Sequence, residues 1–224
     1  MGIIFKILRP LIWLTCRLLF RMRFIGVENI PPRGACLIVP NHVTFVDPIW
    51  ITIPFRRLIY YMAWDKPFEI PVLGSLMRAF GAFPLSLERI DPAAQRGARA
   101  RLQGGCALVI FPEGGRSKNG KVQPFKMGAF RLALTHGVPI IPVTIVGGYE
   151  VWPVGQLLPK LWGRISITYH PPIVVERLPE GVSKSELRML AHSLADRTRD
   201  RIAGPIGASS AEEESGGSSA LETS

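Results

Sequence analysis

Short apolar runs without a charged residue recur along the chain and alternate with longer segments of helical spacing. The clearest runs are residues 35–39 (ACLIV), 107–111 (ALVIF) and 140–146 (IIPVTIV). Strands buried on both faces have this continuous apolar character, and they occur mainly in parallel sheets that helices cover. Parallel neighbours need long crossover connections, so the alternation predicts a single α/β domain whose largely parallel sheet is flanked by helices.

The other segments extend this alternation along the chain. A short extended segment is expected at 24–30, and strands are expected at 35–39, 58–62, 83–87, 107–111, 140–146 and 165–169. Helices are expected at 48–55, 70–80, 92–103, 125–135 and 184–201. Residues 204–224 are rich in Gly, Ser, Ala and Glu and have little apolar surface to bury, so a disordered tail is expected there. The folded domain is therefore expected to span residues 24–203.

The first 23 residues are mostly apolar but carry spaced basic residues. On a helical wheel the basic side chains fall within one arc of about 160°; they are Lys6, Arg9, Arg17, Arg21 and Arg23. Bulky apolar side chains occupy the opposite arc, and the longest charge-free stretch, 10–16, is too short to span a bilayer. Residues 1–23 are thus expected to form an amphipathic helix in a membrane interface, with Trp13 and Phe20 as anchors. The alternative is an ordinary surface helix packed on the core.

The net charge limits the kinds of partner that the protein is expected to bind. Lys and Arg total 27 against 17 Asp and Glu, giving +10, which indicates nucleic acid, an anionic membrane surface or a phosphorylated small molecule. No nucleic-acid-binding module is recognisable, so no nucleic acid partner is expected. We expect a monotopic, membrane-associated protein on the cytoplasmic face of the inner or plasma membrane. The three cysteines fit no disulfide framework and no metal site, which favours a reducing compartment.

A polar cluster, residues 41–48 (NHVTFVDP), directly follows the apolar run 35–39. Open α/β sheets bind ligands at the carboxyl ends of their strands, where this cluster would lie. His42 and Asp47 would face each other only if the chain turns between them, and Asp47 before Pro48 resembles a helix N-cap that supplies such a turn. Alternatively, Asp47 is only a cap and His42 an ordinary loop histidine. The other histidines show no metal-ligand spacing, so no metal is expected.

A second cluster, residues 111–117 (FPEGGRS), follows the run 107–111. Its two glycines would let backbone approach a ligand closely, and the planar fork of Arg116 suits phosphate. We expect Glu113 to orient Arg116 or the loop, because its charge would repel a bound phosphate. Alternatively, Arg116 forms a structural ion pair with Glu113, or the segment is simply a glycine turn with solvated basic residues.

Together the two clusters resemble a known family. The pattern N-H-x-x-x-x-D, with F-P-E-G-x-R-S about 70 residues later, resembles the 1-acylglycerol-3-phosphate acyltransferase family of glycerolipid acyltransferases. The segment 81–84 (GAFP) with Arg89 resembles that family's second block, and 138–143 (VPIIPV) its fourth. Two departures stand out: Gly115 replaces the usual Thr of the third block, and Arg89 lies farther from its glycine than usual.

The resemblance implies transfer of a fatty acyl group from acyl-CoA or acyl carrier protein to the sn-2 hydroxyl of 1-acyl-glycerol-3-phosphate. It implies His42 as general base with Asp47 as its partner, and substrate binding by Glu113, Gly114, Arg116, Arg89 and Lys66. Neither a nucleophilic Ser nor a Cys accompanies His42, so direct attack by the acceptor is expected, without an acyl-enzyme and without a cofactor. Alternatives are an acyltransferase or transacylase for another lysolipid and a non-catalytic membrane-binding relative.

Overall fold

The computed structural model describes the backbone of residues 3–86 and 91–218 and the side chains of residues 10–86 and 91–207. Seven strands form one sheet in the order β1-β7-β6-β2-β5-β3-β4. Their bounds are β1 Arg23–Ile25, β2 Cys36–Pro40, β3 Ile59–Trp64, β4 Ala82–Leu85, β5 Ala107–Val109, β6 Ile140–Val146 and β7 Ser166–Tyr169. The five strands from β6 to β4 are mutually parallel, while β7 pairs antiparallel with β6 and parallel with β1. The sheet is thus largely parallel, as the sequence predicts.

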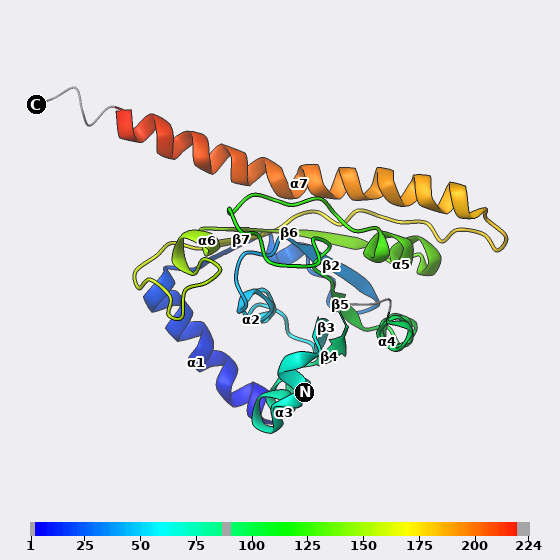
Figure 1. Cartoon of the computed structure of the whole chain (residues 1–224), viewed down its shortest axis with the longest axis horizontal. Helices are drawn as coiled ribbons and strands as arrows, with labels where there is room; N and C mark the ends of the chain where they lie inside the picture. Colours follow the sequence, from blue (N-terminus) through cyan, green and yellow to red (C-terminus); the bar gives the residue numbers. More distant parts are fainter. Residues whose placement is uncertain (1–2, 87–90, 219–224) are drawn as a thin grey trace, which may run out of the picture.

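Helices cover both faces of this sheet (Figure 1). They are α1 Ile3–Phe20, α2 Asp47–Thr52, α3 Pro71–Ala79, α4 Pro92–Gln103, α5 Gly128–His136, α6 Gly148–Val151 and α7 Lys184–Ser218, with short 3-10 turns η1 Val27–Asn29 and η2 Lys66–Glu69. The helices α4, α5 and α7 pack on one face, and α1, α2 and α3 lie on the other. The single α/β domain flanked by helices is therefore confirmed.

The central strand β2 shows why apolar and polar residues do not alternate within the apolar runs. Cys36 and Ile38 point into the core beneath α1 and α2, whereas Leu37 and Val39 point into the core beneath α5 and α7. All four side chains are fully buried. Successive residues of a strand face opposite sides, so a strand with helices on both faces needs apolar residues at every position.

Both ends of the chain differ from the sequence prediction. The helix α1 ends at Phe20, and Arg23 already begins β1, so the N-terminal helix is shorter than 1–23. The predicted tail at 204–224 is wrong as far as Ser218, because α7 continues to that residue. Ile202 is fully buried and anchors α7 just before this segment, and Ala and Glu in the segment are strong helix formers. Residues 219–224 lie outside the described residues.

The parallel strands place the candidate residues at one edge of the sheet. Five strands, β2 to β6 in chain order, end at this carboxyl edge, and β7 and β1 begin there because they run the other way. The loops after β2, β3 and β5 carry His42, Lys66 and Arg116. Within residues 3–86 and 91–218, no helix combines the length and hydropathy needed to cross a membrane.

Candidate active site

His42 and Asp47 form a hydrogen-bonded pair beyond the end of β2. The Nδ1 atom of His42 lies 2.8 Å from Oδ2 of Asp47. Asp47 is fully buried, whereas the His42 side chain keeps 17% of its surface exposed. Of the two interpretations of the spacing, the structure therefore supports the pair. With Nδ1 engaged by Asp47, the other ring nitrogen, Nε2, is the one available to a substrate.

The turn that joins the pair is not the one expected from the sequence. Asp47 is the first residue of α2 and does not cap it, because the N-cap position is Val46 and no side chain bonds to the helix amides there. Instead, the Asp47 carboxylate reaches back along the chain. Its Oδ2 accepts the N–H groups of Val43 and Thr44 at 2.7 and 2.8 Å, and its Oδ1 accepts the Thr44 hydroxyl at 2.6 Å. This network holds residues 42–47 in a tight loop.

The same network fixes the tautomer of His42. An ionised carboxylate only accepts hydrogen bonds, so the hydrogen between His42 and Asp47 belongs to Nδ1. Neutral His42 therefore carries its lone pair on Nε2, the form that a general base requires. A carboxylate in this place also stabilises the imidazolium that forms when Nε2 takes a proton.

The loop after β5 forms hydrogen bonds to both the N–H and the carbonyl of His42. Glu113 Oε1 accepts the His42 N–H at 2.9 Å, and the Ser117 N–H donates to the His42 carbonyl at 2.7 Å. The second oxygen, Oε2, accepts the N–H of Gln123 at 3.0 Å. Glu113 is therefore a clamp between two loops, as its expected role in orienting the loop requires.

Burial raises the pKa of Glu113 to about 7, even though the two amide donors stabilise its ionised form. Its oxygens bond to backbone amides, and the ion pair found within residues 10–86 and 91–207 is His42–Asp47 alone. The alternative that Arg116 is a structural partner of Glu113 is thus wrong. Arg116 is exposed, so its guanidinium is open to a ligand.

Two further contacts set the orientation of the pair. The imidazole ring of His42 stacks on Phe111, with ring centroids 4.0 Å apart. The Asn41 side chain both accepts the Ile145 N–H and donates to its carbonyl, at 2.7 and 3.0 Å, which ties the end of β2 to β6. The loop carrying His42 is therefore fastened at the residue before the histidine and again at the histidine itself.

Of the three other predicted binding residues, the structure describes Gly114 and Lys66. Gly114 has a φ of 72°, a left-handed backbone conformation that favours glycine, and a Cβ there would require the end of the Lys126 side chain to move. Lys66 is exposed at the start of η2, at the end of a strand two places from β2 in the sheet. Arg89 lies outside the described residues.

Sequence reasoning missed the parts played by Thr44, Gln123 and Phe111. Thr44 completes the ring of donors around Asp47, Gln123 supplies the second amide to Glu113, and Phe111 supports the imidazole. None of them has a reactive side chain that would have singled it out. Within the described residues, no group of three or more His, Cys, Asp or Glu side chains is placed to hold a metal ion.

Comparison with known proteins adds an independent finding. The family model described as "Acyltransferase" matches residues 21–146, which include both candidate loops. The chain is 33% identical over 183 residues to the chloroplastic 1-acyl-sn-glycerol-3-phosphate acyltransferase BAT2 of Brassica napus, covering 80% of this chain and 48% of that protein. It is 31% identical over 159 residues to the chloroplastic 1-acyl-sn-glycerol-3-phosphate acyltransferase LPAT1 of Arabidopsis thaliana, covering 69% and 44%. The chain thus spans about half the length of these curated relatives.

A solved structure is similar as well. The crystal structure of the 1-acyl-sn-glycerophosphate (LPA) acyltransferase PlsC from Thermotoga maritima aligns with a TM-score of 0.61 and 30% sequence identity. The alignment covers 80% of this chain and 71% of that one. The family model alone covers more than half of this chain, including His42, Asp47 and Arg116. The chain belongs to the acyltransferase family.

Proposed function

We propose that this chain is a 1-acylglycerol-3-phosphate acyltransferase. It transfers a fatty acyl group from acyl-CoA or acyl carrier protein to the sn-2 hydroxyl of 1-acyl-glycerol-3-phosphate, giving phosphatidic acid. The observation that carries the proposal is the His42–Asp47 pair, held with Nε2 free and clamped to the loop that presents Arg116. The names of the similar proteins support the choice of acceptor.

The proposed mechanism needs one base and no covalent intermediate. Nε2 of His42 removes the proton of the sn-2 hydroxyl as its oxygen attacks the thioester carbonyl, and Asp47 stabilises the resulting imidazolium. Collapse of the tetrahedral intermediate breaks the carbon–sulfur bond, and the proton passes from Nε2 to the leaving thiolate. A trapped acyl-enzyme would contradict this mechanism.

Incubating the purified protein with lysophosphatidate and palmitoyl-CoA tests the activity directly. The matched acceptors are lysophosphatidylcholine and lyso-ornithine lipid. Phosphatidic acid formed only with lysophosphatidate supports the proposal. Faster turnover of another lysolipid assigns the chain to that acceptor, and no turnover of any acceptor leaves only a membrane-binding role.

Substituting Arg116 tests its part in binding the acceptor. A guanidinium holds two phosphate oxygens at once, whereas an ammonium acts as a point charge. Arg116→Lys is therefore expected to raise KM for lysophosphatidate by about 30- to 150-fold, the effect of losing one charged hydrogen bond. Steady-state kinetics with each substrate varied in turn measure this, and KM for the acyl donor should stay nearly constant.

Lys121→Gln is the matched control for Arg116, because Lys121 is an exposed cation of the same loop segment. Both variants should keep the melting temperature of the wild type, since Arg116 forms no ion pair within the described chain. A lower melting temperature for Arg116→Lys, with KM raised for both substrates, would instead point to a structural role.

We also propose that α1 lies on the membrane. Cys16 and Phe20 pack into the core, and Phe20 contacts Trp50 rather than acting as the expected interfacial anchor. Part of the apolar arc does pack on the core, through Ile12 and Leu19. The other part stays exposed: Leu11 and Leu18 are 59% and 61% exposed, and the adjoining Leu14 is 47% exposed. A helix whose apolar surface served only to pack on the core would not leave these three leucines in water. Exposed leucines beside basic residues favour an anionic bilayer as the partner.

Replacing the exposed leucines of α1 should release the protein from vesicles. Each buried leucine contributes about 1.5–3 kcal/mol, so Leu11→Ser/Leu14→Ser/Leu18→Ser is expected to lower partitioning onto phosphatidylglycerol vesicles at least about tenfold. Sedimentation with vesicles measures the bound fraction, which should also fall with added salt. The control Val174→Ser/Met189→Ser removes exposed apolar side chains away from α1. Equal binding by both variants would contradict the role of α1.

A further inference from the structure

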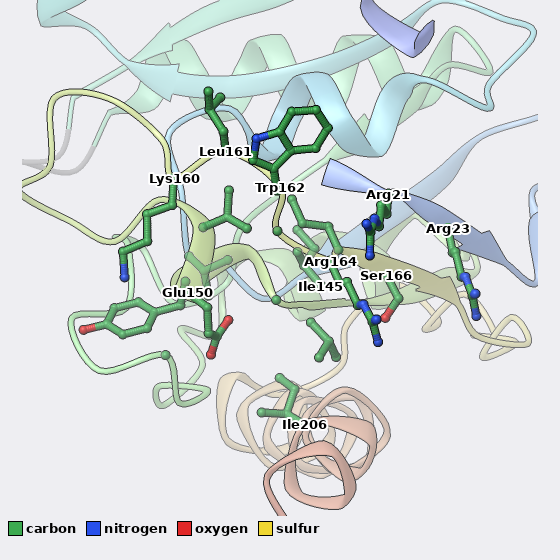
Figure 2. A pocket seen from close by; sticks show the side chains of 18 residues that line it. Arg21, Arg23, Ile145, Glu150, Lys160, Leu161, Trp162, Arg164, Ser166 and Ile206 are labelled. Atoms are coloured by element: carbon green, nitrogen blue, oxygen red, sulfur yellow. The ribbon is translucent and has the colours of Figure 1, made fainter. Parts of the chain in front are cut away.

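A large basic cavity lies at the carboxyl edge of the sheet, separate from the His42 site. Its volume is about 970 Å³, within the range of small-molecule sites. It is bounded by the ends of β6 and the starts of β7 and β1, by α6, by the segment 160–165 and by Ile206 of α7. Figure 2 shows Arg21, Arg23 and Arg164 along one side, with Lys160 and Glu150 on the other.

The charge of this cavity is unbalanced. Four basic side chains line it, Arg21, Arg23, Lys160 and Arg164, against the single carboxylate of Glu150. None of the four forms an ion pair with a carboxylate in the part of the chain that the structure describes. Like charges gathered around one cavity repel each other, and an anion with several negative oxygens would relieve that repulsion.

The backbone around the cavity is also unusual. Arg21 and Trp162 have φ values of 41° and 69°, and they are the non-glycine residues with positive φ among those described. Both line the cavity. The N–H of Trp162 donates to the Leu19 carbonyl, which holds the tryptophan beside the end of α1. Strained conformations of this kind persist where the surroundings fix them, and they concentrate at ligand-binding sites.

The regular spacing of strands in the sheet gives the distance from this cavity to His42. In the strand order, β7 is two places from β2 and β1 is three. Neighbouring strands lie about 4.8 Å apart, so the starts of β7 and β1 lie roughly 10 and 15 Å to the side of the end of β2. Arg164 lies two residues before the start of β7, and Arg23 begins β1. Val43, next to His42, lines the near side of the cavity.

This separation discriminates between the two substrates. In lysophosphatidate the phosphate is on the carbon next to the reacting hydroxyl, so it must bind close to His42, where Arg116 lies. In an acyl-CoA the whole pantetheine arm separates the thioester from the phosphates. Only the donor is long enough to place its thioester at His42 and its phosphates at Arg23 and Arg164.

Resting on the proposed function, we propose that the cavity binds the phosphorylated nucleotide end of a coenzyme A thioester. Arg21, Arg23, Lys160 and Arg164 hold the diphosphate and the ribose phosphate, and the pantetheine arm passes Val43 to His42. Trp162, which is 68% exposed, offers a face on which the adenine stacks. A carrier protein, which presents a single phosphate on the same arm, would use fewer of these cations.

The test compares donors that differ only in their phosphate end, with lysophosphatidate as acceptor. Arg23→Gln/Arg164→Gln should raise KM for palmitoyl-CoA about 10- to 100-fold, the loss expected for charged hydrogen bonds to phosphate. KM for palmitoyl-pantetheine, KM for lysophosphatidate and kcat should be unchanged. The matched control, Arg131→Gln/Arg188→Gln, removes the same charge from the exposed surface of α5 and α7 and should leave all four constants, including KM for palmitoyl-CoA, unchanged.

Four results would overturn the assignment to CoA. They are unchanged kinetics in the Arg23/Arg164 variant, an equal rise for palmitoyl-pantetheine, a rise in KM for lysophosphatidate alone, and a rise confined to palmitoyl carrier protein. Calorimetric titration with CoA and with adenosine 3′,5′-bisphosphate separates this proposal from the proposed function. Suppose that the wild type turns over no donor but binds both nucleotides, and that the Arg23/Arg164 variant binds neither. The proposed reaction is then wrong, but the proposed nucleotide site is supported. Absence of binding to the wild type overturns the site itself.

Discussion

Replacing His42 with alanine is expected to lower kcat by about 10²–10⁴-fold, the usual contribution of a positioned general base. The fold should survive, because two of the hydrogen bonds that fasten this residue involve its backbone. Glu113 accepts its N–H and Ser117 donates to its carbonyl, and both bonds remain in His42→Ala. Initial rates with saturating lysophosphatidate and palmitoyl-CoA measure kcat, and thermal unfolding measures stability.

His192→Ala is the matched control for the His42 variant. His192 is an exposed histidine of α7, away from the carboxyl edge of the sheet. Its loss should leave kcat unchanged. A folded His42→Ala protein with near-normal turnover would rule out the proposed base, and the reaction would then need another proton acceptor.

The core of the fold was predictable because its signals are local. The helix α4 spans Pro92–Gln103 as the sequence predicts, since Asp91 caps it through the amides of Ala93 and Ala94 and proline follows at the first position. The strand β6 likewise spans residues 140–146. Capping residues and uninterrupted apolar runs can be recognised from a few neighbouring residues of the sequence.

The features that the sequence did not predict depend on distant residues. Asp47 before Pro48 looks like a helix cap, but its carboxylate instead meets the amides of Val43 and Thr44 once that loop closes. The continuation of α7 beyond residue 203 follows burial of Ile202 against the rest of the fold. Local composition could not show either contact.

Only part of the candidate site could be predicted, because its other contacts join residues that are distant in the sequence. His42 and Asp47 are five residues apart, so the possibility of a pair could be read from their spacing, although the turn could not. The clamp on His42 joins residues 71 apart, and the second arm of Glu113 reaches Gln123. The basic cavity combines residues near 21, 164 and 206, which share no sequence motif. The pairing of β1 with β7 and the packing of α7 against β6 bring these segments together.

Replacing Asp47 with asparagine is expected to lower kcat by about 10²–10⁴-fold while preserving the fold. The amide oxygen of asparagine can occupy the place of Oδ2 and still accept from Val43, Thr44 and His42. The new NH₂ group then faces the Thr44 hydroxyl, which can accept as well as donate. What is lost is the negative charge that stabilises the imidazolium during proton transfer. Initial rates and thermal unfolding measure the two properties separately.

Asp47→Ala separates the charge from the hydrogen bonds. Alanine leaves the buried amides of Val43 and Thr44 without acceptors, and each unsatisfied donor costs about 1–3 kcal/mol. Asp47→Ala should therefore lose both turnover and several degrees of melting temperature, whereas Asp47→Asn loses turnover alone. Thr44→Val, which removes only the hydroxyl bond to Oδ1, should lower stability with a much smaller effect on kcat, because the charge beside His42 remains. If Asp47→Asn kept wild-type turnover, the carboxylate would serve only to shape the loop, and His42 would act as a base without an ionised partner.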